Sequence, residues 1–143
     1  MRSAPARVLV DTNVLVYAHD PRDVRKQDLA LALLDALIAD ERAVLSAQCL
    51  SEFFVIVTRR LPDPLTPEQA LAQLERFAGA CAVLPVTAAV TTEAARGALR
   101  HGLAYWDALI WAAAKLDQIP LILTEDAVHG RSIDGVRFED PFR

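Results

Sequence analysis

The order of apolar and polar positions along the chain follows two patterns. Short, mainly apolar runs predict strands at residues 8–10, 43–45, 82–86, 121–123 and 136–138, the last of them at an edge of the sheet. Apolar residues spaced three or four positions apart predict helices at residues 14–18, 25–40, 47–60, 67–78, 88–101 and 105–115. Because strands alternate with helices, we expect a three-layer α/β/α sandwich with a short, mostly parallel sheet.

Residues that begin and end helices stand where these predictions need them. Ser46 and Thr87 are good N-caps for the helices that follow them. Thr66 and Gln69 have the spacing of a capping box, and Gly102 is placed to end the helix before it. The local signals therefore agree with the hydrophobic pattern.

The helix expected at residues 47–60 is apolar on two sides. One side carries the large apolar residues Leu50, Phe53, Phe54 and Val57. Val55 and Ile56 lie nearly opposite, on the side that also carries Glu52. Because a helix that is apolar on two sides is buried on both, we expect one side to meet the sheet and the other a second copy of the chain. This pattern predicts a homodimer.

The totals limit the class of protein. At 143 residues, with 53% apolar and 24% charged, the chain is expected to form one packed globular domain over residues 1–143. Cys49 and Cys81 are expected as buried thiols in a reducing compartment. The first seven residues lack the apolar core of a signal peptide, and no apolar run reaches the roughly 18 residues of a membrane span. We therefore expect a cytoplasmic protein without membrane contact.

Polar side chains follow two of the expected strands at the point where each strand ends. The strand at 8–10 leads into Asp11-Thr12-Asn13, and the strand at 121–123 leads into Thr124-Glu125-Asp126. In open α/β sheets, ligands bind outside the carboxyl ends of the strands. The sequence therefore predicts that both groups of side chains reach one edge of the sheet.

Two further acids, Glu52 and Asp107, lie in apolar helices. Asp107 shares a helical stripe with Trp111, and a buried carboxylate is costly unless it is paired, hydrogen-bonded or bound to a metal. Taken singly, each acid also has a simpler explanation. Asp11 and Asp107 could cap helices, Glu52 could be solvated, and Asp126 could belong to a turn. Only their convergence at one place favours a site.

Acids with oxygen-donor neighbours at one sheet edge suit a hard divalent cation such as Mg²⁺ or Mn²⁺. Such a cation can activate a water and stabilise charge on a phosphate. The chain has neither a cysteine–histidine cluster nor a glycine-rich phosphate loop. This combination favours phosphodiester hydrolysis over nucleotide binding. The net charge of −4 argues against a generic nucleic-acid binder, but not against a metal-dependent one.

Four short motifs resemble the acidic motifs of PIN-domain ribonucleases. They are Val10-Asp11-Thr12-Asn13, Ser51-Glu52-Phe53, Tyr105-Trp106-Asp107-Ala108-Leu109-Ile110 and Leu123-Thr124-Glu125-Asp126. The size and spacing are most similar to the VapC toxin of bacterial VapBC toxin–antitoxin pairs, and the resemblance spans residues 8 to about 138. It implies a Mg²⁺- or Mn²⁺-dependent endoribonuclease that is usually a homodimer and is inhibited by a small antitoxin protein.

The resemblance also implies roles for individual residues. The acidic, metal-binding site would consist of Asp11, Glu52, Asp107 and Asp126. The residues that position water, metal or these acids would be Thr12, Asn13 and Thr124. Glu125 remains open as a fifth acid, because only the motif match selects Asp126 over it.

Other side chains support weaker predictions. Trp106 and Trp111 could stack on bases, although an apolar helix favours a place in the core for both. The basic residues that could contact RNA phosphates are Arg22, Arg25, Lys26, Arg59, Arg60, Arg96, Arg100 and Arg131. For each of these taken alone, a solubilising role on the surface is the simpler explanation.

Two other functions remain open from the sequence. A strand that ends in Asp11 also resembles phosphatases with an aspartate nucleophile, of the haloacid-dehalogenase type. In those enzymes a second aspartate follows two positions later, where this chain has Asn13. The other alternative is a PIN fold that binds without catalysing. Loss of an acid would favour it, and all four acids are present.

Overall fold

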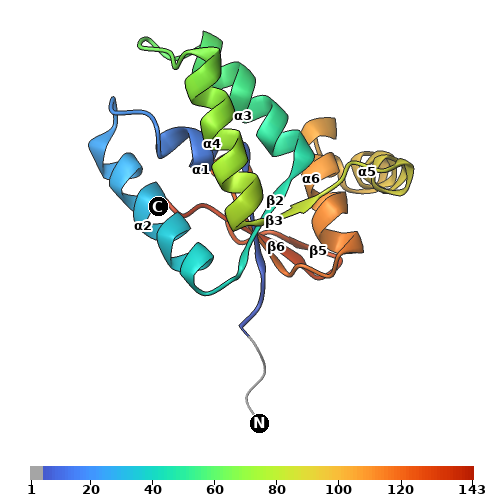
Figure 1. Ribbon diagram of the computed structural model, residues 1–143. Coiled ribbons are helices and arrows are strands. Elements are labelled where there is room, and N and C mark those ends of the chain that lie inside the picture. Colours follow the sequence, from blue (N-terminus) through green and yellow to red (C-terminus); the bar gives the residue numbers. More distant parts are fainter. Residues whose placement is uncertain (1–4) are drawn as a thin grey trace.

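The computed structural model describes residues 5–143 (Figure 1). Residues 1–4 lie outside the described part. The prediction that the first seven residues do not form a signal peptide therefore falls partly outside the described residues. The strands are β1 (Val8–Val10), β2 (Ala43–Ser46), β3 (Ala82–Leu84), β4 (Leu121–Leu123), β5 (Ser132–Ile133) and β6 (Val136–Glu139). The helices are α1 (Thr12–Tyr17), α2 (Val24–Ala39), α3 (Ala47–Arg59), α4 (Pro67–Ala80), α5 (Ala88–His101) and α6 (Tyr105–Leu116).

The strands form one sheet in the order β3-β2-β1-β4-β6-β5. Neighbouring strands run parallel except β5, which is antiparallel to β6. The central strand β1 pairs with β2 and β4, so that Leu9 lies opposite both Val44 and Ile122. The carboxyl ends of β1, β2 and β4 therefore meet at one edge of the sheet, where ligands bind in folds of this kind.

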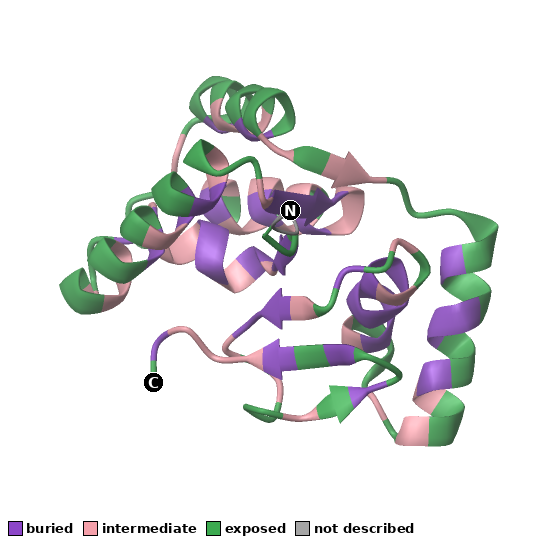
Figure 2. Cartoon of the chain, turned by 90° about the horizontal axis from the view of Figure 1, so that it is seen from below, coloured by how far each residue is buried: buried purple, intermediate pink, exposed green. Residues whose placement is uncertain are grey.

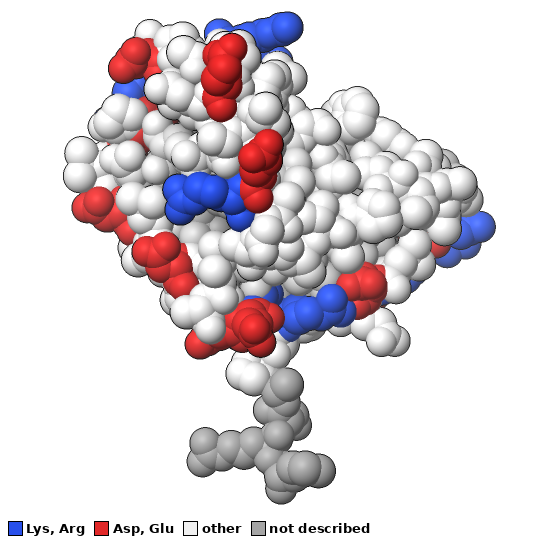
Figure 3. Space-filling model, viewed as in Figure 1, with Lys and Arg blue, Asp and Glu red and all other residues white. Residues whose placement is uncertain are grey.

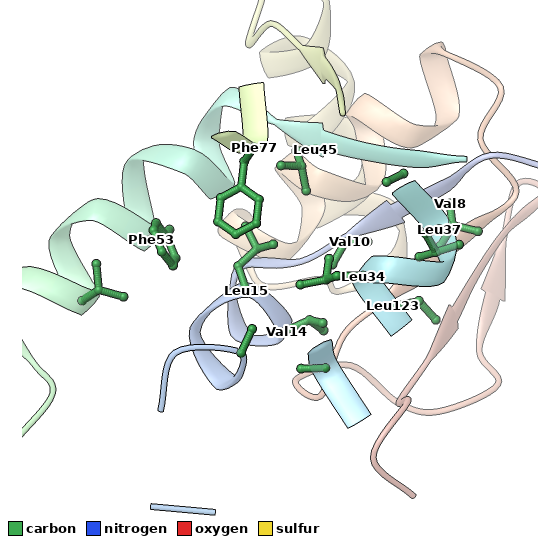
Figure 4. Close-up of a cluster of buried hydrophobic side chains, with 14 of the residues drawn as sticks. Val8, Val10, Val14, Leu15, Leu34, Leu37, Leu45, Phe53, Phe77 and Leu123 are labelled. Atoms are coloured by element: carbon green, nitrogen blue, oxygen red, sulfur yellow. The ribbon is translucent and has the colours of Figure 1, made fainter. Parts of the chain in front are cut away.

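Side-chain alternation along the strands builds a core on each face of the sheet. Val8 and Val10 pack among buried side chains of α1, α2, α3 and α4, and Figure 4 shows this cluster. Leu9 packs on the opposite face with α5 and α6. Figure 2 shows buried residues concentrated in the strands and on the inner sides of the helices. Helices thus cover both faces, which confirms the expected three-layer α/β/α sandwich.

The predicted helix boundaries have the expected local chemistry. The hydroxyls of Ser46 and Thr87 accept hydrogen bonds from backbone N–H groups in the first turns of α3 and α5. Thr66 and Gln69 form the reciprocal pair of a capping box, at 3.1 and 2.9 Å. Gly102 follows α5 with φ of 67°, a left-handed conformation that glycine adopts without strain. These predictions are confirmed.

Several expectations about strand ends and burial are wrong. The strand near residues 136–138 is not at an edge, because the short strand β5 pairs with its outer side. Two residues are too few to show an alternating pattern, so the sequence did not predict β5. Strand β3 ends at Leu84, before Pro85, whose ring removes the N–H that a parallel ladder needs. Cys81 is only half-buried, whereas Cys49 is fully buried.

Helix α6 is the most enclosed helix of the fold, since residues 108–114 are all buried. Trp111 is 1% exposed, and its ring N–H donates to the Ile133 carbonyl at 3.1 Å. A Cβ atom at Gly97 of α5 would lie 2.4 Å from the Trp111 ring, so the two helices pack closely only because residue 97 is glycine. Across residues 5–143, no helix is both long enough and apolar enough to cross a membrane.

Candidate active site

A cleft of about 260 Å³ opens at the carboxyl edge of the sheet. It is lined by side chains from α1, α3 and α6 and from the segment that follows β4. All four acids singled out from the sequence line it, namely Asp11, Glu52, Asp107 and Asp126. Chain segments that are far apart in the sequence therefore bring their carboxylates to one place.

Asp11 follows the last residue of β1 and is the N-cap of α1. Its Oδ1 accepts from the Thr12 backbone N–H at 2.7 Å, and its Oδ2 accepts from the Thr124 hydroxyl, also at 2.7 Å. The buried Cys49 thiol lies 3.7 Å from Oδ1. The capping role considered for Asp11 is thus confirmed, and it does not remove Asp11 from the cleft.

Asn13 and Thr124 join the ends of β1 and β4. The Asn13 Nδ2 donates to Asp126 Oδ2 at 3.0 Å and to the Thr124 Oγ1 at 3.1 Å. Thr124 Oγ1 also accepts from the Asp126 backbone N–H at 3.1 Å. Thr124 is 2% exposed, so the hydrogen bonds of its hydroxyl are largely shielded from water. The three residues and Asp11 form one hydrogen-bonded group.

Glu52 on α3 and Asp107 on α6 form the other wall. Glu52 Oε1 accepts from Gln48 Nε2 at 2.8 Å, and the same amide group donates to the Trp106 carbonyl at 3.2 Å. Asp107 lies in the first turn of α6, whose N-cap is Ala104 and has no side-chain cap bond. The alternative that Asp107 caps its helix is therefore wrong.

Burial and mutual repulsion both disfavour charge on two of these carboxyls. Burial raises the pKa of Asp11 above its ordinary value, hydrogen bonds from Thr124 and Thr12 oppose this rise, and the carboxylates of Asp126 and Glu52 add to it. Burial also raises the pKa of Asp107, and the charges of Asp11 and Asp126 raise it further. A bound cation would offset both effects.

The four acids line one cleft without closing into a ligand group. In the described part of the chain, no set of three or more His, Cys, Asp and Glu side chains is arranged to hold a metal ion. The donor set itself fits a hard divalent cation, because it consists of carboxylates that repel one another, with amide and hydroxyl oxygens beside them.

The remaining predicted residues have different places. Thr12 contributes its backbone N–H to Asp11, but its hydroxyl is buried and has no partner among residues 5–143. Arg22 lines the cleft and forms an ion pair with Asp20 at 2.7 Å. Trp106 is 67% exposed at the cleft, so the expectation of a core position is wrong for it.

Gln48, which bridges Glu52 and α6, was not predicted as a site residue from the sequence. A signal was present, because residues four apart on a helix are neighbours, and Gln48 precedes Glu52 by four positions. The contact of Cys49 with Asp11 was not predicted either. That contact joins α3 to β1 across the sheet edge, and no local pattern indicates it.

The family comparison matches residues 8–131 to the PIN domain. The chain belongs to the PIN-domain family. The match covers all four acidic motifs, and with it the fold predicted from their resemblance is confirmed. No curated protein sequence matches the chain.

Several solved structures of toxin–antitoxin proteins have the same fold. A toxin–antitoxin complex from Klebsiella pneumoniae aligns with a TM-score of 0.69 at 17% identity, over 94% of this chain and 97% of that one. VapBC2 from Rickettsia felis, bound to a promoter DNA fragment, gives 0.66 at 19%, over 92% and 96%. The sarcin–ricin-loop-cleaving toxin VapC20 of Mycobacterium tuberculosis gives 0.62 at 20%, over 91% and 98%.

Proposed function

We propose that this protein is a metal-dependent endoribonuclease and the toxin of a type II toxin–antitoxin pair. The observation that carries the proposal is the convergence of Asp11, Glu52, Asp107 and Asp126 on one cleft in a chain of the PIN-domain family. The structural neighbours support it, since one is a toxin that cleaves the sarcin–ricin loop and others are toxin–antitoxin complexes.

The four acids would hold Mg²⁺ or Mn²⁺, and the cation when bound would supply an activated water and offset charge on the phosphodiester. Asn13 and Thr124 fix the carboxylates of Asp11 and Asp126 relative to each other, because Thr124 donates to Asp11, Asn13 donates to Asp126, and Asn13 also donates to Thr124. Such fixed donors keep the charged groups in place while the substrate binds. Thr12 supports this arrangement through its backbone N–H.

RNA would be held by residues at the rim of the cleft. The exposed indole of Trp106 offers a face for base stacking. Arg22 lines the cleft, and Arg131 lines an adjoining hollow of about 160 Å³ that shares Asp107 and Asp126. Figure 3 shows one face of the molecule, where basic and acidic side chains are interspersed without an extended basic area. That face therefore offers no extended basic surface for RNA.

The proposed partners are a small antitoxin and a second copy of the chain. The antitoxin is supported by the structural neighbours, several of which are toxin–antitoxin complexes. The second copy would cover the outer side of α3 around Val55, which is 39% exposed and lines a groove of about 410 Å³ with Ile56 and Arg60. Water contact with this apolar surface is unfavourable.

The metal requirement is tested with purified protein and a single-stranded or hairpin RNA. We expect no cleavage after exhaustive chelation and recovery on adding Mg²⁺ or Mn²⁺. A small chromogenic phosphate, assayed in parallel, tests the phosphatase alternative and should not be hydrolysed. Unchanged RNA cleavage in chelator would contradict the proposal. Full binding of RNA with no cleavage under any metal would favour the PIN fold as a binding module.

The homodimer is tested by sedimentation at micromolar concentration. We expect a dimer for the unmodified chain and a monomer for Val55→Asp. An unpaired carboxylate on this face would be costly to bury in the interface. Leu71→Asp is a matched control, since Leu71 is 52% exposed on α4. A monomeric unmodified chain would contradict this part of the proposal.

A further inference from the structure

Glu125 and Asp126 are adjacent in the sequence, but the structure gives them different surroundings. Asp126 lines the acid cleft, whereas Glu125 does not. The Tyr17 hydroxyl donates to Glu125 Oε1 at 2.6 Å, and the Lys26 ammonium pairs with Glu125 Oε2. Both oxygens of the Glu125 carboxylate therefore have partners on α1 and α2.

Lys26 is itself held in place. Its backbone N–H donates to Asp23, the N-cap of α2, at 3.1 Å. Its ammonium donates to the Tyr17 hydroxyl at 3.2 Å and lies 4.7 Å from the centre of the Tyr17 ring. The Tyr17 ring packs edge-on against Phe142, which is 4% exposed. Packing and hydrogen bonds thus fix the cation that Glu125 meets.

Backbone and side-chain contacts link Glu125 to the cleft. The Glu125 backbone N–H donates to Asn13 Oδ1 at 3.2 Å. The same Asn13 donates through Nδ2 to Asp126 Oδ2 at 3.0 Å. The Glu125 backbone therefore orients the Asn13 amide, and the Asn13 amide in turn orients the Asp126 carboxylate.

We propose that Glu125 is a positioning residue and not a fifth metal ligand. Together, Glu125, Lys26 and Tyr17 form what we term the loop clamp, which holds residues 124–126 so that Asn13 and Asp126 face the cleft. Lys26 pairs with Glu125, so Glu125 adds no net charge to the cleft. The clamp is a feature of the fold, and its effect on catalysis rests on the proposed function.

The two roles of Glu125 predict opposite effects for Lys26→Met. If Glu125 is a metal ligand, removing its competing cation frees the carboxylate and tightens metal binding. If Glu125 is a clamp, the same change releases the loop and weakens metal binding. Because methionine keeps most of the length and apolar character of the lysine stem, packing against Tyr17 is largely retained.

The experiment measures Mn²⁺ affinity by calorimetry and amide hydrogen exchange of residues 124–126 in chelator. We expect Lys26→Met and Glu125→Gln each to speed exchange and to weaken Mn²⁺ binding about 10-fold, the usual loss when a residue supporting a metal ligand is removed. The double variant should lose no more than either single variant, because both break one unit.

Lys115→Met is the matched control. Lys115 has a similar exposure, pairs with Glu93 at 2.7 Å and lies 5.1 Å from the Trp111 ring centre, but on the far face of the sheet. It should alter neither Mn²⁺ affinity nor exchange at residues 124–126.

The proposal is overturned if Lys26→Met binds Mn²⁺ more tightly, if exchange at residues 124–126 is unchanged, or if the losses multiply in the double variant. The exchange measurement decides the clamp even for a chain that neither binds Mn²⁺ nor cleaves RNA. A chain that neither binds Mn²⁺ nor cleaves RNA would contradict the proposed function but would leave the loop clamp standing.

Discussion

The two walls of the acid cleft differ in how firmly their carboxylates are held. On the sheet side, Asp11 and Asp126 belong to a hydrogen-bonded group with Asn13 and Thr124. On the helix side, Glu52 accepts one hydrogen bond, from Gln48, and no described residue donates to the Asp107 carboxylate.

This difference follows from where each side chain stands. The sheet-side residues continue β1 and β4, which pair residue by residue, so their side chains keep a fixed spacing. The helix-side acids project from two separate helices that meet here through one glutamine. We infer that the sheet side is preorganised and that the helix side would complete the site for the proposed cation.

The largest expected effect is loss of catalysis in Asp11→Asn and in Asp107→Asn. Each removes a charge that would hold the cation, and we expect roughly 10³-fold slower RNA cleavage, because a catalytic metal contributes several kcal/mol. Asparagine has nearly the size of aspartate, so circular dichroism should show both variants folded. Asp63→Asn, in the exposed turn after α3, is the control. A folded Asp107→Asn variant with full activity would remove Asp107 from the site.

Thr124→Val tests the preorganised wall. Valine deletes the donor to Asp11 and the acceptor shared by Asn13 and the Asp126 backbone N–H. Each polar group left without a partner costs about 1–3 kcal/mol. We expect a lower melting temperature and roughly 10–100-fold less activity. Thr124→Ser keeps the hydroxyl and should stay close to the unmodified chain. Equal stability of the valine variant would show that this wall is not held as described.

Gln48→Met tests the helix side. It removes the amide that joins Glu52 to the Trp106 carbonyl, and we expect about 10-fold lower activity with little change in stability. Gln48→Glu should lose more activity, because it places a like charge beside Glu52. If both variants cleave RNA as fast as the unmodified chain, Gln48 does not position Glu52.

The smallest expected effect concerns stability against pH in chelator. The pKa of Asp107 is raised in the fold, so the native state favours the protonated acid. Its contribution to stability is full below the unfolded value of 3.8 and is lost as pH rises through the folded pKa. Asp107→Asn has no carboxyl to ionise at this position and so does not lose this stability. At pH values above the folded pKa of Asp107, the variant should therefore melt a few degrees higher than the unmodified chain. Thermal melts from pH 3 to 8 measure the difference, and saturating Mn²⁺ should reverse it.

Most of the fold was predictable because its signals are local. The apolar run at Val8–Val10 predicted a strand, and the capping box at Thr66 predicted where α4 begins. The predictions failed where long-range packing decides the outcome. Trp106 and Trp111 occupy the same apolar helix, yet only Trp111 faces the core, because α5 and β5 cover that side alone.

The sequence by itself determined which residues have the chemistry of a site, since carboxylates at strand ends and in apolar helices are visible without coordinates. Tertiary structure alone decided how those residues differ. It placed Asp126 in the cleft and Glu125 against Lys26, although the two are neighbours in the sequence. It also placed Gln48 between two helices. The direction of a side chain in an irregular segment depends on the partners that the fold brings to it, and those partners come from elements far away in the sequence.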